Sequence, residues 1–168
     1  MNQRRVVITG LGQISPVGND VETAWQNLLA GKSGIGRITK FDASDVSCQI
    51  AGEVKDFDIS QYLPAKEARR MDSFIHYGIA GALQAIKDAR LDEFAELDKD
   101  RVGVNIGSGI GGLPLIEETS RNVVAGGARK INPFFIPGSL INLISGHITI
   151  LKGYRGHNYG IVSACASG

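Results

Sequence analysis

Short apolar runs alternate with longer amphipathic stretches along this chain. Four short apolar runs predict strands, at residues 6–8, 49–54, 101–106 and 159–162. Apolar residues that recur at helical spacing predict four helices, at residues 20–30, 64–86, 115–124 and 139–151. Because strands and helices alternate, the pattern predicts an α/β fold with a mainly parallel sheet.

Turn and capping residues refine these elements. Asn19, with Glu22 three positions later, is expected to cap the first helix, and Gly31 is expected to end it. Residues 126–130 are expected to form a loop, and the apolar residues 133–137, which lie between two prolines, are expected to form a rigid connector. An apolar connector of this kind is unusual if it faces water.

The second helix is expected to begin at Pro64 and to carry a basic first turn. Lys66, Arg69 and Arg70 all fall at this end, where positive charge opposes the helix dipole. A solvated surface is the simpler interpretation of this cluster, and an acidic partner is the alternative.

Composition and charge exclude several classes of protein. The 168 residues are 43% hydrophobic and 21% charged with a net charge of +1, which indicates a globular domain and favours neither nucleic acid nor a membrane surface as a partner. Cys48 and Cys165 lie too far apart for a metal motif, and they suit a reducing compartment. We find no targeting segment and no run long enough to span a bilayer, so we expect a cytoplasmic protein.

The most informative stretch surrounds Cys165. A strand is expected to end at Val162 and to run into a turn of small residues, Ser163–Gly168, with the thiol at its tip. This arrangement is similar to a nucleophile elbow, and a helix that began just after Cys165 would favour the reactive thiolate. The alternative is a buried thiol that serves only packing.

A glycine-rich loop offers a second candidate function. Gly107, Gly109 and Gly112 follow a strand and precede a helix, as in the dinucleotide-binding fingerprint. The acidic residue that this fingerprint requires about 20 residues later is missing, since Arg129 and Lys130 occupy that region. A nucleotide-binding module therefore stays as the alternative interpretation.

The three histidines give no catalytic pattern. His76 is expected at the surface, His147 is expected to be a hydrogen-bonded core residue, and His157 is expected in a polar loop. None of them forms a visible pair with a carboxylate near Cys165, so a Cys–His–Asp protease is not favoured.

Taken together, several motifs resemble the N-terminal part of a type II β-ketoacyl-acyl-carrier-protein synthase, a condensing enzyme of the thiolase-like family. The resemblance covers essentially all of residues 1–168 and rests on five motifs, at residues 5–12 with 15–18, 69–72 with 77–78, 107–113, 132–137 and 163–168. It implies that this chain is the N-terminal portion of a layered αβαβα domain with a mainly parallel mixed sheet. Two departures from the family pattern stand at Ala166-Ser167 and His157-Asn158.

The resemblance also implies a reaction. Cys165 matches the family's nucleophile, which accepts an acyl group and uses its own backbone amide in the oxyanion hole. Malonyl-acyl-carrier protein is then decarboxylated, and its carbanion attacks the acyl-enzyme in a Claisen condensation that lengthens a fatty acid. The family's catalytic histidines and lysine have no match here, so we expect this chain to be inactive alone. No cofactor and no metal are implied.

Further residues carry over by the same resemblance. Ile110 and Phe135 match residues of the acyl pocket, with Phe135 reaching into the partner subunit of a homodimer. Lys66, Arg69 and Arg70 match a basic patch for the acidic acyl-carrier protein, to which Arg129 and Lys130 of the other subunit are added. The misplaced cations at the helix start would then meet an acidic partner.

Overall fold

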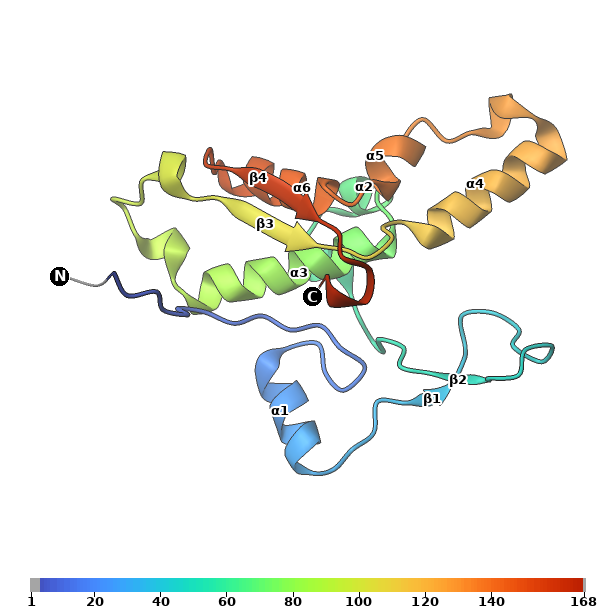
Figure 1. Ribbon diagram of the computed structural model, residues 1–168, viewed down its shortest axis with the longest axis horizontal. Helices are drawn as coiled ribbons and strands as arrows, with labels where there is room; N and C mark the ends of the chain where they lie inside the picture. Colours follow the sequence, from blue (N-terminus) through green and yellow to red (C-terminus); the bar gives the residue numbers. More distant parts are fainter. Residues whose placement is uncertain (1–3, 168) are drawn as a thin grey trace. The chain divides into compact units, whose positions relative to one another are not determined.

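The computed structural model describes residues 4–167, which fall into two compact units. Unit 1 consists of Met1–Asp58 with Leu83–Glu93, and unit 2 consists of Ile59–Ala82 with Phe94–Gly168. Helix α3 (Ser73–Asp88) contributes residues to both units. Figure 1 shows the elements in chain order. Gly168, the last residue of the predicted small-residue turn, lies outside the described residues.

The described residues of unit 1 include helix α1 (Val21–Leu29), the last part of α3 and a small antiparallel sheet. Helix α1 was expected to be capped by Asn19, but the cap is Asp20, whose carboxylate accepts the Thr23 amide at 2.7 Å. Asn19 instead donates its side-chain amide to the carbonyl of Lys55. The sheet pairs β1 (Gly36–Arg37) with β2 (Ile50–Ala51), so the strand predicted at 49–54 is shorter than expected and gains a partner that the pattern did not reveal.

The strand predicted at residues 6–8 is wrong. Residues 6–8 are in no strand, and Val6 and Ile8 are 96% and 84% exposed. The chain that follows turns its amides toward side chains of α3, since Leu11 N donates to Asp88 Oδ2 at 2.9 Å and Gln13 N to Gln84 Oε1 at 3.0 Å. A strand forms only where a neighbouring strand accepts its hydrogen bonds, and no such neighbour exists within residues 4–167.

Unit 2 is built in layers on a parallel pair of strands. β3 (Val104–Gly107) pairs with β4 (Asn158–Ile161) in the register Val104↔Asn158 to Gly107↔Ile161. Helix α6 (Leu143–Lys152) packs on both strands, and Ser145 Oγ donates to the carbonyl of Tyr159 at 3.0 Å. The unit-2 part of α3 packs against α6, and Ile75, Ile79 and Ile148 are almost completely buried. The parallel pair and its covering helices confirm the predicted α/β class.

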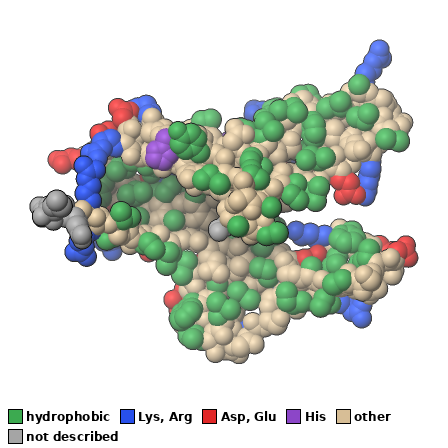
Figure 2. Space-filling view, in the orientation of Figure 1, with side chains coloured by type: hydrophobic (Ala, Val, Ile, Leu, Met, Phe, Trp, Pro, Cys, Tyr) green, Lys and Arg blue, Asp and Glu red, His purple; other side chains and the backbone are tan. Residues whose placement is uncertain are grey.

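The strand before Cys165 is not buried as expected. Tyr159, Ile161 and Val162 are 61%, 47% and 53% exposed. Among residues 4–167 the sheet has only the strands β3 and β4, and the described elements leave these side chains of β4 and the residue after it largely uncovered. Hydrophobic side chains accordingly reach the surface on the face shown in Figure 2.

The long helix predicted from Pro64 is broken into two. α2 (Ala65–Ala68) ends at Arg69, and α3 begins at Ser73. The break is fixed by Asp72, which is 7% exposed. Its carboxylate accepts the Leu115 amide at 2.8 Å and the Phe74 amide at 3.4 Å, and its own amide donates to Gly138 O at 3.1 Å. A continuous helix would lose these tertiary hydrogen bonds.

The remaining elements differ from the prediction mainly at their ends. α4 (Leu113–Gly126) is longer than the predicted 115–124, and Ala128–Lys130 forms a 3-10 turn, η4, rather than an open loop. The connector at 133–137 overlaps a short helix, α5 (Phe135–Ser139). The last predicted helix begins later, as α6, and ends as expected at Gly153 in the left-handed conformation.

Candidate active site

Cys165 lies at the middle of a short 3-10 turn, η5 (Ala164–Ala166), which follows β4 directly. Its thiol is on an exposed residue, as the strand-and-turn prediction requires, so the alternative of a buried packing thiol is wrong. Two serines tie the turn together, because Ser163 N donates to Ser167 Oγ at 2.9 Å and Ser163 Oγ donates to Ala166 O at 2.7 Å. The small side chains around the thiol leave it open to a substrate.

Backbone geometry at the turn exposes a free amide. Ala164 has a φ of 49°, a left-handed conformation that costs a non-glycine residue about 1–2 kcal/mol. The amides of Ala166 and Ser167 are used inside the turn, by the carbonyls of Ser163 and Ala164. The Cys165 amide has no hydrogen-bond partner among residues 4–167, so it is available to an oxygen that approaches the sulfur.

The glycine-rich loop packs directly against this turn. Ser108 N donates to Ile161 O at 3.1 Å, at the end of the parallel pair. A side chain at Gly107 would overlap the carbonyl of Ser167, and a methyl group at Gly109 would lie 3.2 Å from Ala164 O. Gly111, with a φ of 90°, turns the chain against Ser139. These glycines therefore serve close approach between protein segments.

The same geometry does not favour the nucleotide-binding alternative. A phosphate at this loop would need free amides at the start of α4. Gly112 N already donates to Ser139 O at 3.0 Å, and Leu115 N donates to the carboxylate of Asp72. An anionic side chain thus occupies the position that a phosphate would take.

One of the two predicted acyl-pocket residues lies in this loop, and the other lies in the helix against which the loop packs. Ile110 lies within it and is 66% exposed, while Phe135 is a half-buried residue at the first position of α5. The loop connects their neighbourhoods, because it packs on Ala164 at one end and on Ser139 of α5 at the other. The structure therefore places Ile110 between the Cys165 turn and the helix of Phe135.

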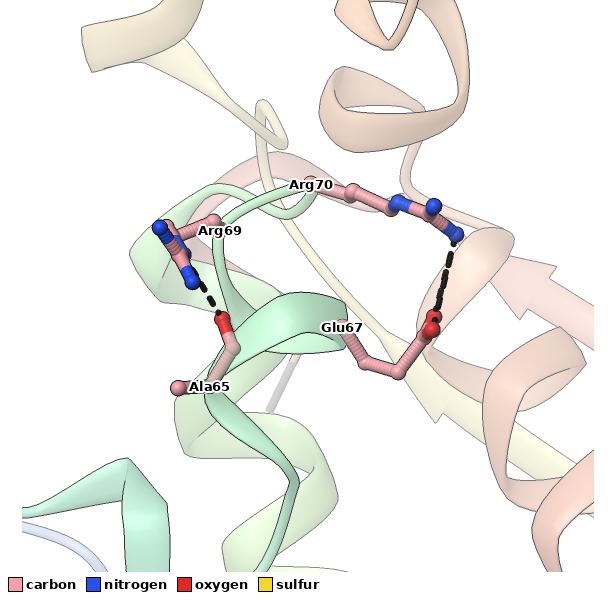
Figure 3. Close-up of polar contacts among 4 residues, drawn as sticks. All are labelled: Ala65, Glu67, Arg69 and Arg70. Carbon is pink, nitrogen blue, oxygen red and sulfur yellow. Dashed lines mark hydrogen bonds and ion pairs between the residues drawn. The ribbon is translucent and has the colours of Figure 1, made fainter.

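Lys66, Arg69 and Arg70 gather at α2, but Arg69 and Arg70 do not lie in the first turn of a helix as expected. Since the helix ends at Arg69, this cation lies at the C-terminal end, which favours positive charge. Arg69 Nε donates to Ala65 O at 3.2 Å, and Arg70 Nη1 pairs with Glu67 at 3.4 Å, as Figure 3 shows. Lys66 is exposed and has no ion pair within residues 4–167.

Arg129 and Lys130 lie elsewhere, in η4 beyond the C-terminal end of α4. The 14 residues of α4 span about 20 Å at 1.5 Å per residue. The α2 cations lie near the start of α4, because Asp72 caps it. The two predicted basic groups therefore stand on different elements, at α2 and at η4.

His157 lies in a loop as expected, but His76 and His147 are placed differently from expectation. His76 is half-buried, with Nε2 2.9 Å from Ala68 O, and not a surface residue. His147 is also half-buried, but the prediction of a hydrogen-bonded core histidine is wrong, because its Nε2 is buried without a partner among residues 4–167. Burial lowers the pKa of His147, and the nearby negative charge of Glu67 opposes that shift. His157 is exposed and stacks on Tyr159 at 5.6 Å.

Two site residues escaped the sequence analysis. Asp72 positions the start of α4, and Glu67 holds Arg70. Glu67 follows Lys66 within the basic cluster and was visible as an i, i+3 partner of Arg70. Asp72 gave no comparable signal, since its partner Leu115 lies 43 residues away.

Residues 4–167 contain no group of His, Cys, Asp and Glu side chains that could hold a metal ion. In the same part of the chain, no helix has the length and apolar character to cross a membrane.

The sequence itself matches a described family over nearly its whole length. Residues 3–168 match the family model "Beta-ketoacyl synthase, N-terminal domain". The chain belongs to this family. It is 51% identical over 168 residues to the 3-oxoacyl-(acyl-carrier-protein) synthase 2 of Vibrio harveyi, covering 100% of this chain and 40% of that protein. The chain thus spans about 40% of the length of such curated relatives.

Solved structures agree with this assignment. The ishigamide ketosynthase/chain length factor is similar with a TM-score of 0.83 and 28% identity, over 95% of this chain and 40% of that chain. A type II polyketide synthase acyl-carrier protein in complex with its ketosynthase, AntDE:AntF, is similar with a TM-score of 0.71 and 27% identity, over 91% of this chain and 40% of that one. These likenesses confirm the predicted α/β fold in its thiolase-like form.

Proposed function

We propose that the complete protein that carries this chain is a condensing enzyme of fatty acid elongation. It joins an acyl thioester to malonyl-acyl-carrier protein by decarboxylative Claisen condensation, through an acyl-Cys165 intermediate. The observation that carries the proposal is the exposed Cys165 with its unoccupied backbone amide, in a chain 51% identical to a 3-oxoacyl-(acyl-carrier-protein) synthase 2.

The acylation step follows from this geometry. The Cys165 thiolate attacks the thioester carbonyl, and negative charge develops on the carbonyl oxygen. The Cys165 amide, which has no partner among residues 4–167, donates to that charge as an oxyanion-hole donor. Collapse of the intermediate expels the carrier thiolate, which takes up a proton, and leaves the acyl group on Cys165.

The condensation step consumes the second substrate. Malonyl-acyl-carrier protein loses carbon dioxide, and its carbanion attacks the acyl-Cys165 carbonyl. The carbon–carbon bond forms as the Cys165 thiolate leaves, which regenerates the nucleophile. The chain from residue 4 to residue 167 has no pair of histidines in the turn that carries Cys165. We therefore assign none of these residues to the decarboxylation of malonyl-acyl-carrier protein.

The remaining roles belong to the same proposal. Ile110 and Phe135 shape the acyl pocket, and Lys66, Arg69 and Arg70 bind acyl-carrier protein together with Arg129 and Lys130 of a second subunit. The second subunit is the other copy of a homodimer. A cytoplasmic location suits an enzyme whose nucleophile is a free exposed thiol.

Labelling of the two cysteines tests the proposal. Cys48 and Cys165 are both exposed, so exposure alone would give equal labelling. In the complete gene product, a thiol-directed acyl thioester mimic is expected to label Cys165 selectively, as read by peptide mapping. Cys165→Ala is expected to lower condensation by about a thousandfold or more, whereas the matched control Cys48→Ala leaves it unchanged. Equal labelling of both cysteines would contradict the assignment of the nucleophile.

Nucleotide titration tests the alternative. Because the amides at the start of α4 are occupied, calorimetry with NAD is expected to show no saturable binding. Saturable binding that Asp72→Asn or a substitution at Gly109 alters would favour the nucleotide-binding module instead.

A further inference from the structure

Arg69 and Arg70 are neighbours in sequence but differ in their contacts. Arg70 Nη1 lies 3.4 Å and 3.5 Å from the two carboxylate oxygens of Glu67, and the Arg70 guanidinium lies over the Phe134 ring, 4.6 Å from its centroid. Arg69 makes only a hydrogen bond from Nε to Ala65 O, and its charge meets no carboxylate within residues 4–167. Figure 3 shows the two side chains pointing in opposite directions from the turn.

Packing of the backbone explains why Arg70 takes this direction. Its carbonyl lies against α5, since a methyl group on Gly138 would meet Arg70 O at 2.7 Å, and Asp72 N donates to Gly138 O. The side chain therefore leaves the turn along α5, where Phe134 precedes the first helical residue. Its side chain is 37% exposed and that of Glu67 is 45% exposed, so solvent screens their ion pair only in part.

The charge of the basic cluster is therefore partly used within the protein. Residues 66–70 carry three cations and one anion, and the anion is paired with Arg70. Lys66 and Arg69 can meet an acidic partner directly. An acidic group that approaches Nη1 of Arg70 competes there with the Glu67 carboxylate.

We propose that Glu67 is an intramolecular competitor of the acidic partner for Arg70. In the free protein Glu67 holds Arg70 on Phe134, and a carboxylate or phosphate of the bound acyl-carrier protein displaces Glu67. This inference rests on the proposed function for the identity of the partner. Because Arg70 also lies over Phe134, the exchange of its anionic partner takes place beside the start of the helix that carries Phe135, a proposed acyl-pocket residue.

Arginine reactivity tests the hold on Arg70 without any partner. The complete gene product is treated with phenylglyoxal, and modification of each arginine is followed by peptide mass spectrometry. Arg70 is expected to react more slowly than Arg69, and Glu67→Gln is expected to speed its reaction about two- to fivefold, the range for a partly exposed ion pair. Arg69 serves as the internal reference. Equal rates for Arg70 in wild type and Glu67→Gln would overturn the inference.

A double-mutant cycle tests the competition itself. Glu67→Gln is expected to tighten binding of an acyl-carrier protein about two- to fivefold, and this gain is expected to vanish in an Arg70→Gln background. Asp100→Asn is the matched control, because it removes the same charge and likewise leaves an arginine, Arg155, without its ion pair. This control is expected to leave affinity unchanged. A gain that persists without Arg70, or that Asp100→Asn reproduces, would overturn the inference.

The outcomes separate this inference from the proposed function. Wild-type binding of the carrier with no gain in Glu67→Gln would refute the competitor role alone. Absence of wild-type binding would refute the partner and with it the competition, while the phenylglyoxal rates would still decide whether Glu67 holds Arg70.

Discussion

The two units bury their apolar side chains to very different extents. In unit 2, Ile75, Ile79 and Ile148 are less than 2% exposed and form a core between α3 and α6. In unit 1, Trp25 and Leu29 of the amphipathic α1 are 56% and 63% exposed, and the only buried residue of that helix is Ala24. Both units carry amphipathic helices. The apolar pattern therefore predicts where a helix forms, but not whether other parts of the protein bury its apolar face.

Unit 1 is held to a greater extent by polar contacts. Its N-terminal segment is tied to α3 through the side chains of Gln84 and Asp88, and Asn27 Nδ2 donates to Val17 O at 2.6 Å. Hydrogen bonds add only about 1 kcal/mol each in net terms, whereas a buried isoleucine side chain adds about 1.5–3 kcal/mol. Stability is therefore expected to be concentrated in unit 2, which also contains all of the proposed site residues.

Truncation of one apolar side chain in each unit gives the largest expected difference. Ile148→Ala is expected to lower the free energy of unfolding by about 2–5 kcal/mol, because it leaves a cavity in the core of unit 2. Leu28→Ala, at a position that is 53% exposed, is expected to cost less than about 0.5 kcal/mol in urea denaturation of the complete gene product. A cost for Leu28 close to that for Ile148 would show that the apolar face of α1 is covered in the complete protein.

Removal of the Asp72 carboxylate is expected to have the next largest effect. Asp72→Ala leaves the amides of Leu115 and Phe74 without their acceptor, which is expected to cost about 1–3 kcal/mol by urea denaturation. Asp72→Asn is the control, since it keeps one side-chain acceptor and is expected to cost less. If both substitutions lowered the free energy of unfolding equally, the oxygen that Asp72→Asn retains would contribute nothing, which would contradict its role as an acceptor.

In unit 1, the cap of α1 is expected to contribute less. Asp20→Ala is expected to cost about 1 kcal/mol at pH 7. The Thr23 amide lowers the pKa of Asp20 in the folded protein, so its contribution is present above the ordinary carboxyl pKa and is lost as the pH falls through the lowered value. Wild type and variant are therefore expected to converge in urea denaturation as the pH falls through this lowered pKa. A constant difference below that pKa would contradict this origin.

His147 is expected to give the smallest effect. Burial lowers its pKa in the folded protein, so the unfolded chain binds more protons as the pH drops below about 6.5, and acid destabilises the fold. The melting temperature of wild type is expected to fall more between pH 7.5 and 5 than that of His147→Gln, by about 1–3 °C. The opposing charge of Glu67 keeps this effect small. Parallel melting curves at both pH values would contradict it.

The sequence predicted best those features whose determinants lie close together in the chain. The parallel strands, α4, the end of α6 at Gly153 and the exposed thiol at the Cys165 turn all follow from runs of about ten residues. In unit 2 the apolar pattern predicted burial correctly where α3 and α6 cover each other, at Ile75, Ile79 and Ile148, but not at β4.

The features that were missed depend on contacts between distant segments. The break between α2 and α3 requires the bond from Asp72 to Leu115, and the position of Arg70 requires Phe134, 64 residues further along. The wrong strand at 6–8 has the opposite cause, because an apolar run was taken to have a strand neighbour that residues 4–167 do not provide. Periodicity cannot report either condition.

The length of α4 has a consequence for the direction in which its end faces. Each helical residue advances the chain by about 100° of rotation about the helix axis. Deleting two residues of α4 would therefore rotate η4 about this axis by about 200° and turn Arg129 and Lys130 to the opposite side. Deleting four residues would shorten the helix by about 6 Å but leave the same side facing outward within about 40°. The rotational phase of this helix, and not only its reach, sets the surface on which those two cations are presented.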